Sequence, residues 1–195
     1  MLVLSPKGMT TTWVVDSNAF IHLGSLSPIG LIESLENALK DNGIKLHVTS
    51  GVHDEVRNVR FQKWDGRPNL LSTISHLLTT VTIGEGEIRA IAQKIGEQAA
   101  PQDVDLSLMV LAARYELEGR KVVLVTDDFK MTTTKVKAGF GFETCPPSTF
   151  INRLSESASN KHTTTLRTLS RHIRAAEMRY AISRSAEYDI QAKLT

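Results

Sequence analysis

The chain has 195 residues, of which 41% are hydrophobic, and this is enough for one domain with a buried core and an accessory segment. The net charge of +2 is too small for composition alone to indicate a nucleic-acid partner. The single cysteine excludes an internal disulfide and a multi-cysteine zinc site, and it favours a reducing, cytoplasmic location. Because no apolar run reaches the roughly 20 residues of a membrane-spanning helix, we expect no membrane partner.

The first half of the chain predicts two strands and three helices. A short apolar strand occupies 13–15, and apolar residues at helical spacing predict a helix over 28–43, with proline at its start and glycine at its end. Alternating apolar and polar residues predict a strand over 44–48. A helix over 50–60 follows. After a loop that contains glycine and proline, a third, short helix is expected over 70–78.

The second half of the chain continues the alternation. Helical spacing predicts a helix over 85–98 and a long one over 103–119. A near-continuous apolar strand over 121–126 is typical of a strand inside a parallel sheet. A helix over 127–138 and a short strand near 142–144 complete the pattern.

Strands that alternate with helices predict an α/β fold: a three-layer α/β/α domain around a central, mainly parallel sheet, with a helical C-terminal tail. The domain is expected to span residues 12–154. Residues 155–195 are expected to form a polar linker and then a basic helical extension, with an amphipathic helix over 166–184.

Acidic residues follow two of the predicted strands. Asp16 comes directly after the first strand, and Asp127 and Asp128 come directly after the strand at 121–126. Because ligands of open α/β sheets bind outside the carboxyl ends of the strands, we expect these carboxylates at one sheet edge. Asp127 and Asp128 also suit the cap of the following helix, which does not exclude metal binding. Asn18 and Thr126 are expected to hydrogen-bond the carboxylates or to shape the turns.

Two further acids lie on predicted helices beside apolar residues. Asp105 shares its helix face with apolar residues at i+3, i+4 and i+7. A buried carboxylate without a partner is costly, so we expect Asp105 to have one. Glu55 lies between Val52 and Val59 on a similar face, although it could equally be a helix-surface residue.

Carboxylates gathered in one cleft repel each other. Two of them about 4 Å apart cost about 1 kcal/mol in water and about 4 kcal/mol at an effective dielectric of about 20. A bound dication reverses the sign, and oxygen-only ligands select Mg²⁺ or Mn²⁺. Such ions orient a phosphodiester and activate water. We therefore predict a metal-dependent phosphodiester hydrolase, with these metal-binding and catalytic residues: Asp16, Glu55, Asp105 and Asp128, assisted by Asp127.

Four motifs, in this order and spacing, resemble those of the PIN-domain ribonuclease family. They are VVDSNAFI around Asp16, VTSGVHDEV around Glu55, DVDLSLMVLA around Asp105 and LVTDDF around Asp128. The resemblance covers roughly residues 12–150 and implies a PIN-like domain. It also implies a metal-dependent RNA endonuclease that leaves 5′-phosphate and 3′-hydroxyl ends, with Asp127 as the additional acid of some branches.

The family includes VapC-type toxins of toxin–antitoxin pairs and the type of endonuclease that matures small-subunit ribosomal RNA. The stretches TDDF and LAARYELEG look closer to the ribosomal type, whereas the zinc-ribbon tail of that type is missing here. The resemblance therefore implies processing of ribosomal or transfer RNA, with single-stranded or structured RNA as the substrate. Two alternatives stay open: a toxin ribonuclease, and a non-catalytic PIN scaffold that binds RNA or protein.

Two basic regions are candidates for contact with RNA. The first surrounds Trp64 and contains Arg57, Arg60 and Lys63, and an aromatic residue among basic ones suits single-stranded RNA. The second is the C-terminal helix, where three arginines share a face and could contact phosphates. These are Arg167, Arg171 and Arg174. Alternatively, this helix docks on the domain with a solvated basic side, or it binds a second copy or a protein partner.

Overall fold

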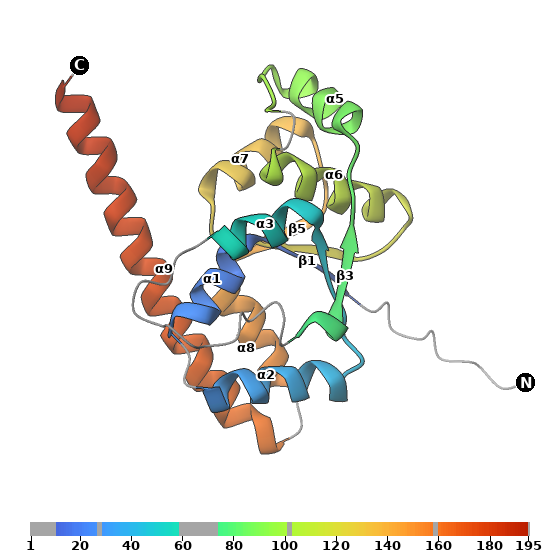
Figure 1. Ribbon diagram of the computed structural model, residues 1–195, viewed down its shortest axis with the longest axis vertical. Coiled ribbons are helices and arrows are strands. Elements are labelled where there is room, and N and C mark those ends of the chain that lie inside the picture. The colour runs from blue at the N-terminus through green and yellow to red at the C-terminus, as the bar shows by residue number, and fades with distance from the viewer. Residues whose placement is uncertain (1–10, 27–28, 59–73, 101–102, 158–159, 195) are drawn as a thin grey trace, which may run out of the picture.

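The computed structural model describes residues 11–26, 29–58, 74–100, 103–157 and 160–194. Within these ranges, five strands form one parallel sheet in the order β3-β2-β1-β4-β5. Helices pack on both faces of this sheet (Figure 1). The predicted α/β class with a central parallel sheet is confirmed, and the arrangement is compatible with three α/β/α layers.

The elements alternate along the chain much as their apolar patterns predict. The strands are β1 (Thr12–Val15), β2 (Leu46–Thr49), β3 (Leu78–Val81), β4 (Val122–Val125) and β5 (Glu143–Cys145). The helices are α1 (Ser17–Leu26), α2 (Ile29–Asp41), α3 (Ser50–Asn58), α5 (Glu85–Ile95), α6 (Val104–Leu117), α7 (Phe129–Ala138), α8 (Pro147–Ser157) and α9 (Asn160–Leu194), with a 3-10 turn, η1, at Ser75–Leu77. In the described part of the chain, no helix is both long and apolar enough to cross a membrane.

The sheet changes its direction of growth between β1 and β4. From β1 the chain passes through α1 and α2 to β2 on one side, and from β4 it passes through α7 to β5 on the other side. Right-handed crossovers place these connections on opposite faces. Accordingly, α1 and α2 pack with α9, whereas α5, α6 and α7 pack together. The carboxyl ends of β1 and β4 are therefore neighbours, with Val15 paired to Val125.

The central strands are readable from the sequence because both of their faces are covered. All four residues of β4 are buried, as expected for a strand inside a parallel sheet. The edge strand β3 is mostly part-exposed, so it lacks such an apolar run. The predicted helix over 70–78 is wrong in its described part: Ser75–Leu77 form a 3-10 turn and Leu78 begins β3. The β-branched threonine and valine residues of Leu78–Val81 favour a strand over a helix.

The chain beyond residue 154 differs from the predicted polar linker. Helix α8 continues to Ser157, and α9 begins at Asn160. The polar residues there did not signal a helix, because part of their stabilisation comes from tertiary burial, as at Ser155, which is 1% exposed. Helix α1 was also not predicted. It begins at Ser17, directly after Asp16, so no recognisable loop separates it from the preceding strand.

The first half of α9 docks on the domain through a narrow buried stripe. Leu166, Leu169 and Ile173 are fully buried and belong to the same hydrophobic cluster as the sheet. His162 and Ala176 extend the stripe at spacings of four and three residues, which keep one helix face toward the domain. The structure therefore agrees with the docked alternative. Beyond this stripe, α9 continues away from the body of the domain (Figure 1).

One acidic residue in α9 fastens it to α8. The Ser148 backbone N–H donates to Glu177 Oε1 at 2.7 Å, and the Ser148 hydroxyl donates to Oε2 at 2.6 Å. The Ser170 hydroxyl donates to the Ser148 carbonyl at 2.8 Å. Ser148 lies in the first turn of α8, where the helix dipole stabilises a negative charge. Glu177 thus acts as a cap that α9 supplies to α8.

We expect Glu177→Ala to lower the free energy of unfolding by about 1.5–3 kcal/mol, because it removes hydrogen bonds to a charged group and leaves a helix end uncapped. The midpoint of thermal unfolding, followed by circular dichroism, should fall by several degrees. Glu33→Ala, at an exposed position on α2, is the matched control and should change it little. Equal midpoints for the two variants would show that Glu177 does not hold α9 in place.

Candidate metal and nuclease site

Asp16 lies at the carboxyl end of β1, where the sheet changes direction. Its Oδ2 accepts a hydrogen bond from the Thr126 hydroxyl at 2.8 Å, and its Oδ1 accepts one from the Ser17 hydroxyl at 3.1 Å. The residue is only 2% exposed. Burial raises the pKa of Asp16 to about 6, against the hydrogen bonds from Thr126 and Ser17, which lower it, and the negative charge of Glu55 adds to the rise.

Thr126 organises the turn that follows β4. Besides donating to Asp16, its hydroxyl oxygen accepts a hydrogen bond from the Asp128 backbone N–H at 3.1 Å. Its own backbone N–H donates to the Cys145 carbonyl at 2.9 Å, which ties the turn to β5. One threonine therefore connects the ends of β1, β4 and β5. Asn18, the other expected supporting residue, is part-buried in α1 and makes no hydrogen bond with these aspartates in the described structure.

Asp105 lies in the first turn of α6 and faces the same group of acids. Its pKa is raised to about 7, first by burial and then by the negative charges of Asp16, Asp128, Asp103 and Glu55. Asp103 is the N-cap of α6 and accepts from the Leu106 backbone N–H at 2.9 Å. No described basic side chain forms an ion pair with Asp105. Lys130 lines the same small pocket as Asp105, but its ammonium group pairs with Glu97, at 3.9 Å.

Glu55 approaches the cluster from α3. It is exposed, so the expected apolar surroundings are not found, yet its charge raises the pKa of both Asp16 and Asp105. The two helices approach each other closely one turn earlier: a Cβ atom at Gly51 would lie 2.7 Å from Val104 Cγ2. Only glycine fits there without a shift, and this close approach brings α3 near the start of α6.

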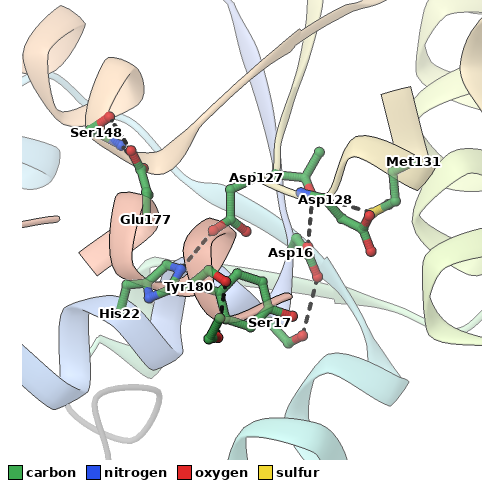
Figure 2. A network of polar contacts seen from close by, with 11 residues as sticks. Asp16, Ser17, His22, Asp127, Asp128, Met131, Ser148, Glu177 and Tyr180 are labelled. Carbon is green, nitrogen blue, oxygen red and sulfur yellow. Dashed lines mark hydrogen bonds and ion pairs between the residues drawn. The ribbon is translucent and has the colours of Figure 1, made fainter. Parts of the chain in front are cut away.

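The adjacent acids after β4 point in different directions (Figure 2). Asp128 caps α7, with Oδ1 accepting from the Lys130 backbone N–H at 2.7 Å, so the capping alternative is correct for Asp128. Asp127 instead pairs with His22 of α1, whose Nε2 lies 2.7 Å from Asp127 Oδ2. Asp127 was expected to assist the metal-binding carboxylates, and the structure instead places its side chain against His22.

His22 is the functional candidate that sequence reasoning missed. Its side chain is 10% exposed and that of Asp127 is 8% exposed, and Asp127 Oδ1 is buried without a hydrogen-bond partner. The Tyr180 ring of α9 packs edge-on against the His22 ring, with centroids 5.9 Å apart. One signal was available: consecutive residues in extended backbone point to opposite sides, so two adjacent aspartates could not both face one cleft.

The predicted basic contacts fall into two groups. Arg60 and Lys63 lie outside the described residues, as does the side chain of Arg57. The three arginines of α9 are described, and all are exposed on the helix. They are Arg167, Arg171 and Arg174.

The donor set at the sheet edge suits a hard divalent cation. Carboxylate oxygens at the end of β1, in α6 and in the β4–α7 turn are the ligands that Mg²⁺ and Mn²⁺ prefer. The pKa of Asp105 is raised first by burial and then by the negative charges of the neighbouring acids, and a bound cation would oppose both effects. Among the described side chains, no three acids, histidines or cysteines already stand at the distances of a metal cage. The oxygen donors therefore fit such an ion in their chemistry, although the described carboxylates stand farther apart than the ligands of a closed metal cage.

Comparisons of the chain with protein-family models, with curated proteins and with solved structures gave no match.

The raised pKa of Asp105 has a consequence for stability. Because its folded value of about 7 exceeds the ordinary 3.8, its protonation stabilises the fold below about pH 4, and this contribution is lost as the pH rises through 7. With a chelator present, we expect Asp105→Asn to raise the unfolding midpoint at about pH 8 by about 2–4 °C for each 1 kcal/mol of repulsion relieved, and to change it little only below about pH 4, where Asp105 is protonated in both the folded and the unfolded chain. The exposed Asp54→Asn is the control. A lowered midpoint at about pH 8 would show that Asp105 is not repelled by its neighbours.

Proposed function

We propose that this chain is a metal-dependent endoribonuclease with a PIN-like domain. The observation that carries the proposal is the meeting of Asp16, Asp105 and Asp128, from three different elements, at the point where the sheet changes direction. Open α/β sheets bind their ligands at this place. Hydrolysis of a phosphodiester is suggested by the carboxylates, and RNA as the polymer is suggested by the resemblance of the four motifs.

Asp16, Asp105 and Asp128 would hold Mg²⁺ or Mn²⁺, with Glu55 close enough to contribute from α3. When bound, the ion neutralises the carboxylates, polarises the phosphate and lowers the pKa of water. The hydrogen bonds from Thr126 and Ser17 orient the Asp16 carboxylate, since each of its oxygens accepts one of them and keeps a further lone pair. The Lys130 backbone N–H orients Asp128 in the same way. These contacts hold the ligands before the substrate arrives.

His22 and Asp127 support the same turn from the other side. The hydrogen bond between His22 Nε2 and Asp127 Oδ2 links α1 to the residue that precedes Asp128, so it limits the movement of the β4–α7 turn. Because both side chains are almost fully buried, water competes little for this hydrogen bond. We therefore assign Asp127 a positioning role in the proposed enzyme, in which it acts through the backbone of Asp128.

The competing proposal is a non-catalytic scaffold that binds RNA or protein. The observation in its favour is that the described carboxylates do not form a closed metal cage. Against it stands the energetic cost of gathering repelling carboxylates where no function needs them. A toxin of a toxin–antitoxin pair would share the catalytic site, so only its partner and target RNA would distinguish it.

We expect the chain to cleave single-stranded RNA in the presence of Mn²⁺, and Asp105→Asn to slow cleavage about 10²–10³-fold. Loss of one ligand removes several kcal/mol of charge stabilisation, and about 1.4 kcal/mol corresponds to a tenfold change in rate. The measurement is the single-turnover rate on an end-labelled RNA, with the exposed Asp54→Asn as the control for loss of an acid outside the cluster. If wild type and Asp105→Asn cleave at equal rates, the nuclease proposal fails and the scaffold is favoured.

An exposed aromatic residue beside the cluster favours a single-stranded substrate. Phe129 follows Asp128 at the start of α7 and is 83% exposed. A ring in this position offers a surface on which an unpaired base can stack, and such stacking is tolerant of base identity.

We expect Phe129→Ala to raise the Kd for single-stranded RNA about 5- to 150-fold, which corresponds to the loss of about 1–3 kcal/mol of stacking. Phe129→Trp should bind at least as tightly as wild type. Leu117→Ala removes an equally exposed apolar side chain (Leu117 is 89% exposed) at the far end of α6, so it controls for surface hydrophobicity. Equal Kd values for all four proteins would exclude stacking on Phe129.

A further inference from the structure

A polar groove lies between α8 and α9, apart from the carboxylate cluster. Helix α8 contributes Ser148, Thr149 and Asn152, and α9 contributes Arg167, Ser170, Arg171 and Arg174. The three arginines stand at i, i+4 and i+7, so they follow one face of α9 over about 10 Å. The groove thus has a row of guanidinium groups along one wall and short polar side chains along the other.

The positive charge of this groove is not balanced within the described structure. None of the three arginines forms an ion pair with a described carboxylate, and all three are exposed. Glu177, the acid nearest to them on α9, already binds Ser148 through both of its oxygens. On the opposite wall, Asn152 uses one of its two amide N–H groups to donate to Glu156. Arg153, which does not line the groove, is paired with Glu143. The groove therefore offers donors to an external anion.

The groove begins near the sheet edge that carries the aspartates. Helix α8 follows β5, whose carboxyl end lies beside that of β4. Figure 2 shows Ser148 and Glu177 in one view with His22, Asp127 and Asp16. One turn after Glu177, the Tyr180 ring packs on His22, which pairs with Asp127. From this point Arg174, Arg171 and Arg167 follow at increasing distance along α9.

We infer that the groove between α8 and α9 binds the sugar–phosphate backbone of the RNA, several nucleotides away from the bond that is cleaved. The inference rests on the proposed nuclease function for the identity of the polymer. Each arginine contacts one phosphate, since guanidinium groups bind phosphate oxygens in a bidentate manner. Asn152 and Thr149 contribute neutral donors to the phosphates or to the ribose hydroxyls. Such contacts position the RNA without reading its sequence.

The test compares wild type with the triple variant Arg167→Gln, Arg171→Gln, Arg174→Gln, using the full chain and a fluorescein-labelled oligouridine of about 12 nucleotides in EDTA. For single strands, each phosphate contact contributes about 0.7 to the slope of log Kd against log salt concentration, so the triple variant should lose about 2 from that slope. Raising KCl from about 50 to about 200 mM should then weaken wild-type binding roughly 20-fold more than binding of the variant. Glutamine keeps the helix propensity, and an unchanged unfolding midpoint verifies folding.

The control variant is Arg89→Gln combined with Arg179→Gln, which removes exposed arginines that do not line the groove and should lose less of the slope. Wild-type slope and affinity in the triple variant would overturn the inference even if Asp105→Asn abolishes cleavage. Conversely, a smaller slope of log Kd against log salt concentration in the triple variant supports RNA binding by the groove, even if the chain proves unable to cleave RNA. Equally tight binding of an oligoglutamate of similar charge would also overturn it, because the groove would then suit an acidic protein segment.

Discussion

The pairing of β1 with β4 is the constraint on which the rest of the site depends. It brings Val15 opposite Val125, so that Asp16 and Thr126 emerge side by side where the sheet changes direction. The Thr126 hydroxyl then holds one oxygen of Asp16 and also accepts the backbone N–H of Asp128. Burial and the other acids raise the pKa of Asp16 and Asp105 into the neutral range. Without a cation, this edge of the sheet therefore costs stability, and a divalent ion would remove that cost.

Helix α9 is connected to this edge of the sheet through the hydrophobic core and through side-chain contacts. Its buried stripe joins the hydrophobic core, and the Glu177 side chain caps α8. Through Tyr180 it contacts His22, and through His22 it reaches the residue next to Asp128. In the proposed enzyme, the helix both stiffens the catalytic turn and presents arginines to the substrate. A segment that composition marks as an accessory tail thus supports the site.

The sequence was most informative where one local rule decides the outcome. Central strands such as β4 are recognisable because they are apolar throughout, and Asp16 and Asp128 are placed by the strands that they follow. Asp105 was recognised because an acid on an apolar helix face needs a reason. The edge strand β3 and helix α1 were missed because their patterns are weak and short. The pairing of His22 with Asp127 could not be predicted, since residues 105 positions apart meet only in the folded chain. Glu55 proved more exposed than its valine neighbours indicated, because its side chain lies at the border of that face.

The most direct test of the central claim is anomalous diffraction at the manganese absorption edge, from crystals of the full chain grown with Mn²⁺ near pH 7.5. The account predicts an anomalous peak within coordination distance, about 2.0–2.6 Å, of oxygens from Asp16, Asp105 and Asp128. It also predicts that the peak disappears in Asp105→Asn crystals grown in the same way. A wild-type map without a peak at this edge, with the carboxylates hydrogen-bonded to each other as protonated acids, would contradict the account.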